Sequence, residues 1–302
     1  MISRRNILAG GLALAATPSW AHADASGPVH IPVDFSQYGM PILSVTIGGK
    51  GPFRFALDTG AETNLIKPDL AKSLGLQAID SVQTYALNGH ALAQQYLADN
   101  IVFGGGLRQS RISVLALSDI GDYDGMLAAG FLTSLPSELD YGAGEIRLYP
   151  SGGPNLAGYL PIPGGIEQFD SQTSPRMFCQ LTIDGLTLKV MIDTGSPREL
   201  LLYPDAVRTN KLWDKYPTFT PEISRGATGA TSAARVVTMP DLRLGDIHVA
   251  SLDVKLLDPT GHQASNHHQG LLGSQFLQNF SLTVGRGKVA LRPNADTAPP
   301  KG

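Results

Sequence analysis

The stretch FALDTGAETNLI at residues 55–66 places one aspartate, Asp58, between two apolar runs. The stretch VMIDTGSPRELLL at residues 190–202 does the same with Asp193. An aspartate between such runs is expected at the end of a buried strand and not on a solvated face. Because a buried carboxylate without a partner is costly, we expect the two aspartates to meet and share a proton.

The two stretches belong to a longer internal repeat. A lone Asp-Thr-Gly triplet would be weak, because aspartate and glycine are common in turns. Further segments recur in the same order at offsets of about 135 to 145 residues, namely 46–49 with 182–185, 68–71 with 204–207, 125–132 with 270–277, and 139–150 with 282–293. Solenoid repeats have periods of roughly 20 to 50 residues, so this longer spacing predicts two domains of one fold.

With these motifs the chain resembles the pepsin/retropepsin-like aspartic proteases, most of all bacterial single-chain members with two retropepsin-like halves. The resemblance spans about residues 41–293. In the family, a hydrophobic-hydrophobic-glycine segment follows each triplet and threads beside the catalytic loop. Leu271-Leu272-Gly273 fits this pattern, whereas Met126-Leu127-Ala128 departs from it with alanine in the glycine position. The departure concerns the tightness of the first threaded loop and leaves the aspartate pair untouched.

The resemblance implies a mostly β fold, with two homologous closed β-barrel-like acid-protease domains and the active site at their interface. Composition agrees, since the 302 residues include 34 glycines and 21 prolines that divide short, often β-branched segments. The expected division is a signal peptide at 1–23, an N-terminal retropepsin-like domain at 24–151, a linker at 152–166, a C-terminal retropepsin-like domain at 167–294, and a disordered tail at 295–302.

The N-terminus resembles a twin-arginine export signal. Arg4 and Arg5 precede a short apolar stretch at 7–16, which is too short to span a bilayer, and Ala21-His22-Ala23 fits a cleavage site. We therefore expect a periplasmic or secreted protein that is free of the membrane after cleavage. A disordered basic tail is the alternative.

Charge and side-chain inventory exclude several function classes. The formal net charge is −3, so no basic surface argues for nucleic acid. The single cysteine, Cys179, cannot form an internal disulfide, and its apolar flanks predict a buried strand residue. We expect no metal and no cofactor. His267 and His268, with Asp258 or His262, are the alternative metal ligands, but their polar surroundings favour a loop.

The aspartate pair would support peptide hydrolysis. Two carboxylates in contact titrate in separated steps, so one is charged while the other is protonated. The charged one removes a proton from water and the neutral one hydrogen-bonds the peptide carbonyl. We expect Gly60 and Gly195 to let the backbone turn tightly under Asp58 and Asp193. The resemblance further implies that the hydroxyls of Thr59 and Thr194 cross-link the two loops, which is a scaffold role.

The residues after the two triplets differ. Ala61 cannot donate a hydrogen bond from its side chain, whereas Ser196 can. A donor to a carboxylate lowers its pKa. We therefore expect the missing donor at Ala61 to move the active window upward from strongly acidic pH.

A family member needs a flap that covers the bound peptide. Asn88-Gly89 follows Asp58 at a spacing suited to a retropepsin flap and carries a strong hairpin signal. A second flap would include Gly226 and Gly229, and Tyr85 is the candidate for the pepsin flap tyrosine. Ordinary surface hairpins are the alternative at both places.

The resulting hypothesis is an aspartic endopeptidase that acts on a polypeptide substrate bound in extended form. Because one chain carries both triplets, we expect a monomer to be the active unit. Two alternatives stay open. The first is a catalytically inactive exported binding protein that retains the fold, and the second is an exported structural β-protein whose triplets are turns.

Overall fold

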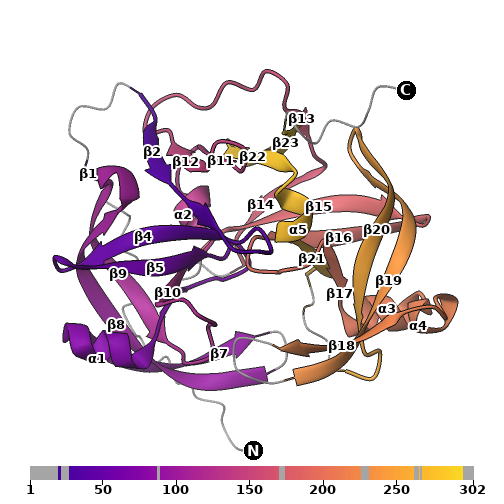
Figure 1. Cartoon of the computed structure of the whole chain (residues 1–302), viewed down its shortest axis with the longest axis horizontal. Helices are drawn as coiled ribbons and strands as arrows, with labels where there is room; N and C mark the ends of the chain where they lie inside the picture. The colour runs from indigo at the N-terminus through magenta and orange to yellow at the C-terminus, as the bar shows by residue number, and fades with distance from the viewer. Residues whose placement is uncertain are drawn as a thin grey trace, which may run out of the picture.

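The computed structural model describes residues 20–21, 27–86, 89–169, 174–225, 231–261, 265 and 267–294. The fold is mostly β and contains two closed six-stranded barrels (Figure 1), so the predicted fold class is confirmed. No helix in the described part of the chain has the length and apolarity that crossing a membrane requires.

The first barrel closes in the strand order β4 (Pro41–Ile47), β5 (Lys50–Leu57), β10 (Gly125–Leu127), β6 (Asn64–Ile66), β9 (Arg108–Ala116) and β8 (Gly89–Phe103). Strand β8 returns to β4 and also extends into a hairpin with β7 (Gln77–Ala86). Two short strands add to the periphery, β3 (Asp34–Phe35) on β4 and β1 (Trp20–Ala21) on β9. Strand β5 lies between β4 and β10, and Asp58 directly follows it.

The second barrel repeats this order with β15 (Arg176–Ile183), β16 (Leu186–Asp193), β21 (Gly270–Gly273), β17 (Leu200–Leu202), β20 (Ile247–Leu257) and β19 (Thr231–Leu244). Strand β19 returns to β15 and continues into a hairpin with β18 (Thr220–Arg225). An edge strand, β14 (Gly164–Glu167), pairs with β15. The repeated order confirms two units of one fold.

A third sheet joins the halves. Its order is β13 (Leu160–Pro161), β23 (Lys288–Pro293), β22 (Phe280–Gly285), β11 (Ser137–Asp140), β12 (Glu145–Leu148) and β2 (Val29–Pro32). At its centre, β11 of the first half pairs antiparallel with β22 of the second, with Leu139 opposite Leu282. Arg292 reaches across this seam to the buried carboxylates of Glu138 and Asp140.

The helices are short. Helix α1 (Pro68–Leu74) begins with proline in its first turn, and Gly75, whose φ of 67° is left-handed, caps its C-terminal end. The others are α2 (Gly130–Thr133), α3 (Pro204–Thr209), α4 (Leu212–Lys215), α5 (Ser274–Leu277) and the 3₁₀ turn η1 (Gly104–Gly106).

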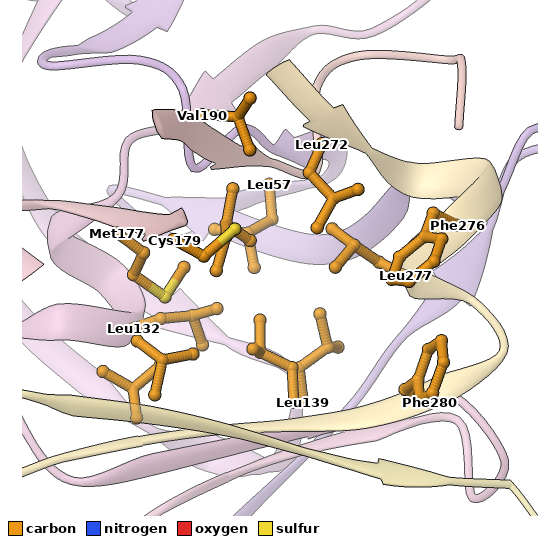
Figure 2. Packing of buried hydrophobic residues seen from close by; sticks show 14 of the residues in the cluster. Leu57, Leu132, Leu139, Met177, Cys179, Val190, Leu272, Phe276, Leu277 and Phe280 are labelled. Atoms are coloured by element: carbon orange, nitrogen blue, oxygen red, sulfur yellow. The ribbon is translucent and has the colours of Figure 1, made fainter. Parts of the chain in front are cut away.

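The largest hydrophobic core cluster runs through both halves. Figure 2 shows Leu57 of β5, Leu139 of the joining sheet and Leu272 of β21 packed within it. Cys179 lies in the same cluster at 1% exposure, which confirms the buried strand position. Burial raises the pKa of its thiol to about 12, so the thiol is protonated and unreactive at neutral pH.

Candidate active site

Each aspartate is held where a buried strand ends beside a parallel neighbour. Asp58 directly follows β5, and its amide donates to the carbonyl of Leu127 on β10 at 2.9 Å. Asp193 is the last residue of β16 and pairs with Gly273 on β21. The apolar residues before each aspartate are buried in the barrels, which leaves the carboxylates at the barrel ends.

The structure brings the two carboxyl groups together across the halves, where they hydrogen-bond to each other. Each lies against the glycine of the opposite triplet. A β carbon on Gly60 would stand 2.6 Å from the carboxyl carbon of Asp193, and one on Gly195 would come still closer to Asp58. Neither glycine has a positive φ. The backbone does turn tightly here, since the amides of Ala61 and Ser196 donate to the carbonyls three residues earlier, both at 3.2 Å. What requires glycine at these two positions is the close approach of the opposite carboxylate, because no left-handed φ is involved.

Backbone amides cradle each carboxylate from its own loop. Oδ1 of Asp58 accepts hydrogen bonds from the amides of Gly60 at 2.9 Å and Ala61 at 3.1 Å. Oδ1 of Asp193 accepts one from the amide of Gly195 at 2.8 Å. These bonds orient each carboxylate from its own loop.

Thr59 and Thr194 link the two loops symmetrically. The Thr59 hydroxyl donates to the carbonyl of Ile192 at 2.8 Å, and the Thr194 hydroxyl donates to the carbonyl of Leu57 at 2.5 Å. The Thr59 hydroxyl oxygen also accepts the Thr194 amide at 3.0 Å, and the Thr194 hydroxyl oxygen accepts the Thr59 amide at 3.1 Å. Four buried hydrogen bonds thus hold the aspartates in register.

Burial dominates the electrostatics of the pair. Loss of hydration raises the pKa of Asp58 above 3.8, while hydrogen bonds from Asp193 and the loop amides partly offset the rise. The pKa of Asp193 is raised well above 3.8 by burial and by the neighbouring charge on Asp58. Between the two titrations the pair therefore carries one negative charge and one proton.

The Ser196 hydroxyl is not the hydrogen-bond donor to a carboxylate that its comparison with Ala61 suggests. The Ser196 hydroxyl is buried at 5% exposure, and among the described residues it has no hydrogen-bond partner. It therefore does not donate to Asp193. Burial is the largest cause of the raised pKa of both aspartates, and the charge of Asp58 adds to the rise at Asp193.

The threaded segments differ in how tightly they fit. A β carbon on Gly273 would lie 2.5 Å from the carbonyl oxygen of Ser196, so only glycine fits there. In the first half Ala128 is fully packed, and its amide donates to Oδ1 of Asn64 at 2.9 Å. The alanine thus leaves the threading of Met126 and Leu127 beside β5 intact.

Both candidate flaps are hairpins. In the first, Ala86 of β7 pairs with Gly89 of β8; Asn88 and the Tyr85 side chain lie outside the described residues. In the second, β18 and β19 pair up to Arg225 and Thr231; Gly226 and Gly229 lie outside the described residues. Figure 1 shows β7 and β18 at the same edge of the molecule.

Sequence reasoning missed an ion pair between the halves. Arg176 at the start of β15 contacts Glu62 in the loop that follows Asp58, with Nη2 2.5 Å from Oε1. The amide of Ser174 also donates to the Glu62 carbonyl at 3.0 Å. No pattern in a single sequence marks such a pair, because the two residues come together only once the halves assemble.

His268 lies in a loop before β21, as the sequence suggests, but its side chain is buried. It is 8% exposed, with Nε2 3.1 Å from the Tyr203 hydroxyl and Nδ1 2.8 Å from that of Ser265. Burial, followed by the charge of Arg176, lowers its pKa to about 4. His262 lies outside the described residues, and no cluster of three metal-ligating side chains occurs within them.

A family model described as aspartyl protease matches the chain twice, at residues 43–132 and 179–276. These matches cover more than half of the chain and place one copy on each half, so the chain belongs to the aspartyl protease family. The predicted family is thereby confirmed.

Comparison with solved structures gives two matches at low sequence identity. The aspartic proteinase from Irpex lacteus superimposes with a TM-score of 0.55 at 14% identity, covering 90% of this chain and 99% of that one. The basic 7S globulin from soybean gives a TM-score of 0.49 at 11% identity, with 88% and 95% covered. Comparison with curated protein sequences gives no significant match.

Proposed function

We propose that this protein is an aspartic endopeptidase that hydrolyses peptide bonds with Asp58 and Asp193. The observation that carries the proposal is the contact between two buried carboxyl groups whose pKa values are both raised, Asp193 the more. Such a pair holds one proton over a range of pH, which acid–base hydrolysis requires. Membership of the aspartyl protease family supports the same reaction.

In the proposed reaction, Asp58 takes a proton from a water molecule, whose oxygen attacks the carbonyl carbon of the scissile bond. Asp193 donates its proton to the carbonyl oxygen as that oxygen becomes negative. The tetrahedral intermediate then collapses, the carbon–nitrogen bond breaks, and the amine leaves with the proton from Asp58. Asp193 recovers its proton from the hydroxyl of the intermediate, so one water is consumed and the pair returns to its starting state.

The substrate is a polypeptide bound in extended form beneath the β7–β8 and β18–β19 hairpins. We further propose that the twin-arginine-type N-terminus directs export to the periplasm or beyond, and that a single chain is the active unit. The location of one triplet in each half of one chain supports the last point.

The test is cleavage of a mixed peptide library by the purified protein, measured from about pH 3 to 8. Asp58→Asn and Asp193→Asn are compared with wild type, and circular dichroism verifies that each is folded. We expect both variants to lose cleavage. Cleavage that survives both substitutions would place the chemistry elsewhere.

The alternative is an inactive exported binding protein with the same fold. The buried Ser196 hydroxyl without a partner in the described chain, and Ala128 in a glycine position, mark departures from strict symmetry. A folded wild-type protein that binds peptides and cleaves none at any pH would favour this alternative.

A further inference from the structure

The internal repeat allows the two halves to be compared on the face that carries the aspartates. Side chains alternate along a strand, so Ala56 lies on the same face of β5 as Asp58, two residues later. Met191 is related to Asp193 in the same way on β16. Each is buried in a small hydrophobic cluster separate from the main core. These two clusters therefore lie next to the candidate active site.

Strand register assigns matching positions in the two clusters. Met126 pairs with Ala56 and Leu65 in the first half, as Leu271 pairs with Met191 and Leu201 in the second. On the hairpins, Ala93 of β8 matches Ala234 of β19, and both are buried. Most of the two clusters is apolar in both halves.

At two matching positions the halves differ, because the second half carries a charged residue. Leu65 pairs with Leu115, whereas Leu201 pairs with Lys255. Ala93 pairs with Val82, whereas Ala234 pairs with Glu222. Leu115 and Val82 belong to or pack on the first cluster. The second half thus holds a lysine and a glutamate where the first holds leucine and valine.

These charges form a compact group with Arg198, which lies five residues after Asp193. Lys255 is 9% exposed, and its Nζ is 3.3 Å from Oε2 of Glu222. Arg198 pairs with the other oxygen of Glu222. The matching residue five positions after Asp58 is Thr63, which carries no charge. Buried charges at an apolar position are costly, so their presence calls for a role.

The group is rich in hydrogen-bond donors. Arginine and lysine only donate, and here two cations face one carboxylate. Arg198, the most exposed of the three, also lines a polar cavity of about 380 Å³. Two carboxylates, Glu199 and Asp253, line the same cavity. Both already accept hydrogen bonds, Glu199 from the Asp253 amide and Asp253 from the Thr238 hydroxyl.

We propose that Arg198, Glu222 and Lys255 set a difference in specificity between the two sides of the scissile bond. The substrate position beneath the second hairpin takes a side chain with a hydrogen-bond acceptor, such as glutamine or glutamate. The matching position beneath the first hairpin takes an apolar side chain, because Val82 and Leu115 stand there. This inference rests on the proposed function and names its substrate class.

The test transplants the first-half residues into the second half with the triple variant Arg198→Thr, Glu222→Val, Lys255→Leu. Its control, Asp99→Val with Arg111→Leu, removes an exposed cross-strand ion pair of the first half. Peptides that differ only in Gln, Glu or Leu are compared at each position flanking the scissile bond. Cleavage is measured with ordinary peptides, and binding is measured with analogues whose scissile bond is reduced to –CH₂–NH–.

At the position beneath the second hairpin, we expect wild type and control to favour Gln or Glu over Leu. We expect the triple variant to shift the ratio of Gln or Glu to Leu toward Leu by about tenfold or more. Equal ratios in wild type and triple variant at every position would overturn the inference and leave the endopeptidase standing. Selective binding of the reduced peptides without any cleavage would support the inference and remove the proposed function. A protein that binds no peptide would overturn both.

Discussion

Gly60 lies directly against the carboxylate of Asp193, although the two residues come from different halves of the chain. The matching contact of Gly195 with Asp58 makes the arrangement reciprocal. The distance between the two aspartates therefore depends on the absence of a side chain at two positions, and this dependence can be measured.

Gly60→Ala is expected to push the aspartates apart. A methyl group there would overlap the Asp193 carboxylate, and displacement by about 1 Å can cost about a hundredfold in rate. Turnover of a cleaved peptide gives the loss, and circular dichroism verifies the fold. Gly27→Ala is the matched control, since a β carbon at Gly27 meets nothing within 4 Å. Unchanged turnover in Gly60→Ala would contradict the close contact.

The pH dependence of cleavage should be bell-shaped and lie above the ordinary carboxyl range. The proposed mechanism needs one aspartate charged and the other protonated, so activity should fall as pH drops through the lower of the two raised pKa values and as pH rises through the higher. A profile of kcat/KM against pH for the free enzyme checks both limbs. A maximum at about pH 2 to 3 would contradict the raised pKa values.

Asp193→Asn should make the folded protein more stable at neutral pH. Where pH lies between 3.8 and the raised pKa of Asp193, the folded state keeps a proton that the unfolded state has lost. The free energy of unfolding therefore falls as pH rises through that window. Removing the group should raise Tm at pH 7 by about 3 °C, with little change at pH 3. An equal shift at both pH values would point to a different cause.

Thr59→Val should weaken the link between the loops. It leaves the Ile192 carbonyl without its donor and the Thr194 amide without its acceptor, both in buried surroundings. The expected cost is about 1 to 3 kcal/mol in the free energy of unfolding by urea. Thr59→Ser keeps the hydroxyl and should recover most of this loss. A serine variant as unstable as the valine variant would assign the effect to packing.

His268 should make the protein sensitive to acid. Its pKa falls from 6.5 to about 4 in the folded state, where Arg176, Lys189 and His267 disfavour its charge. The stability that it contributes is complete above 6.5 and is lost as pH falls toward 4, by up to about 3 kcal/mol. His268→Gln should show a smaller loss between pH 7 and 4 by denaturant unfolding. An equal loss of stability between pH 7 and 4 in the variant and in wild type would show that His268 does not cause the acid sensitivity.

Local patterns predicted local structure well. Pro68 and Gly75 flank the sequence of α1, and runs of apolar residues mark the ends of the strands that lead to the aspartates. The two-unit fold also follows from the repeat. Contacts across the halves were not predictable from one sequence, because no local signal connects Arg176 with Glu62.

Two residues show why composition alone misleads. His268 stands among polar neighbours in the chain but packs against Phe178 and Tyr203, which belong to distant strands or their ends. Gly60 looks like a turn glycine, yet its role depends on a carboxylate from the other half. In both cases tertiary surroundings decide what the residue does.

The pairing of β11 with β22 has a consequence for how such a molecule can evolve. In a dimer of two identical subunits, every substitution appears on both sides of the active site at once. Here both copies lie in one chain and the joining sheet holds them together, so a substitution in one copy leaves the other copy unchanged. Val82 and Glu222 are free to differ because a single gene encodes them separately, and one side of the substrate can be recognised without altering the other.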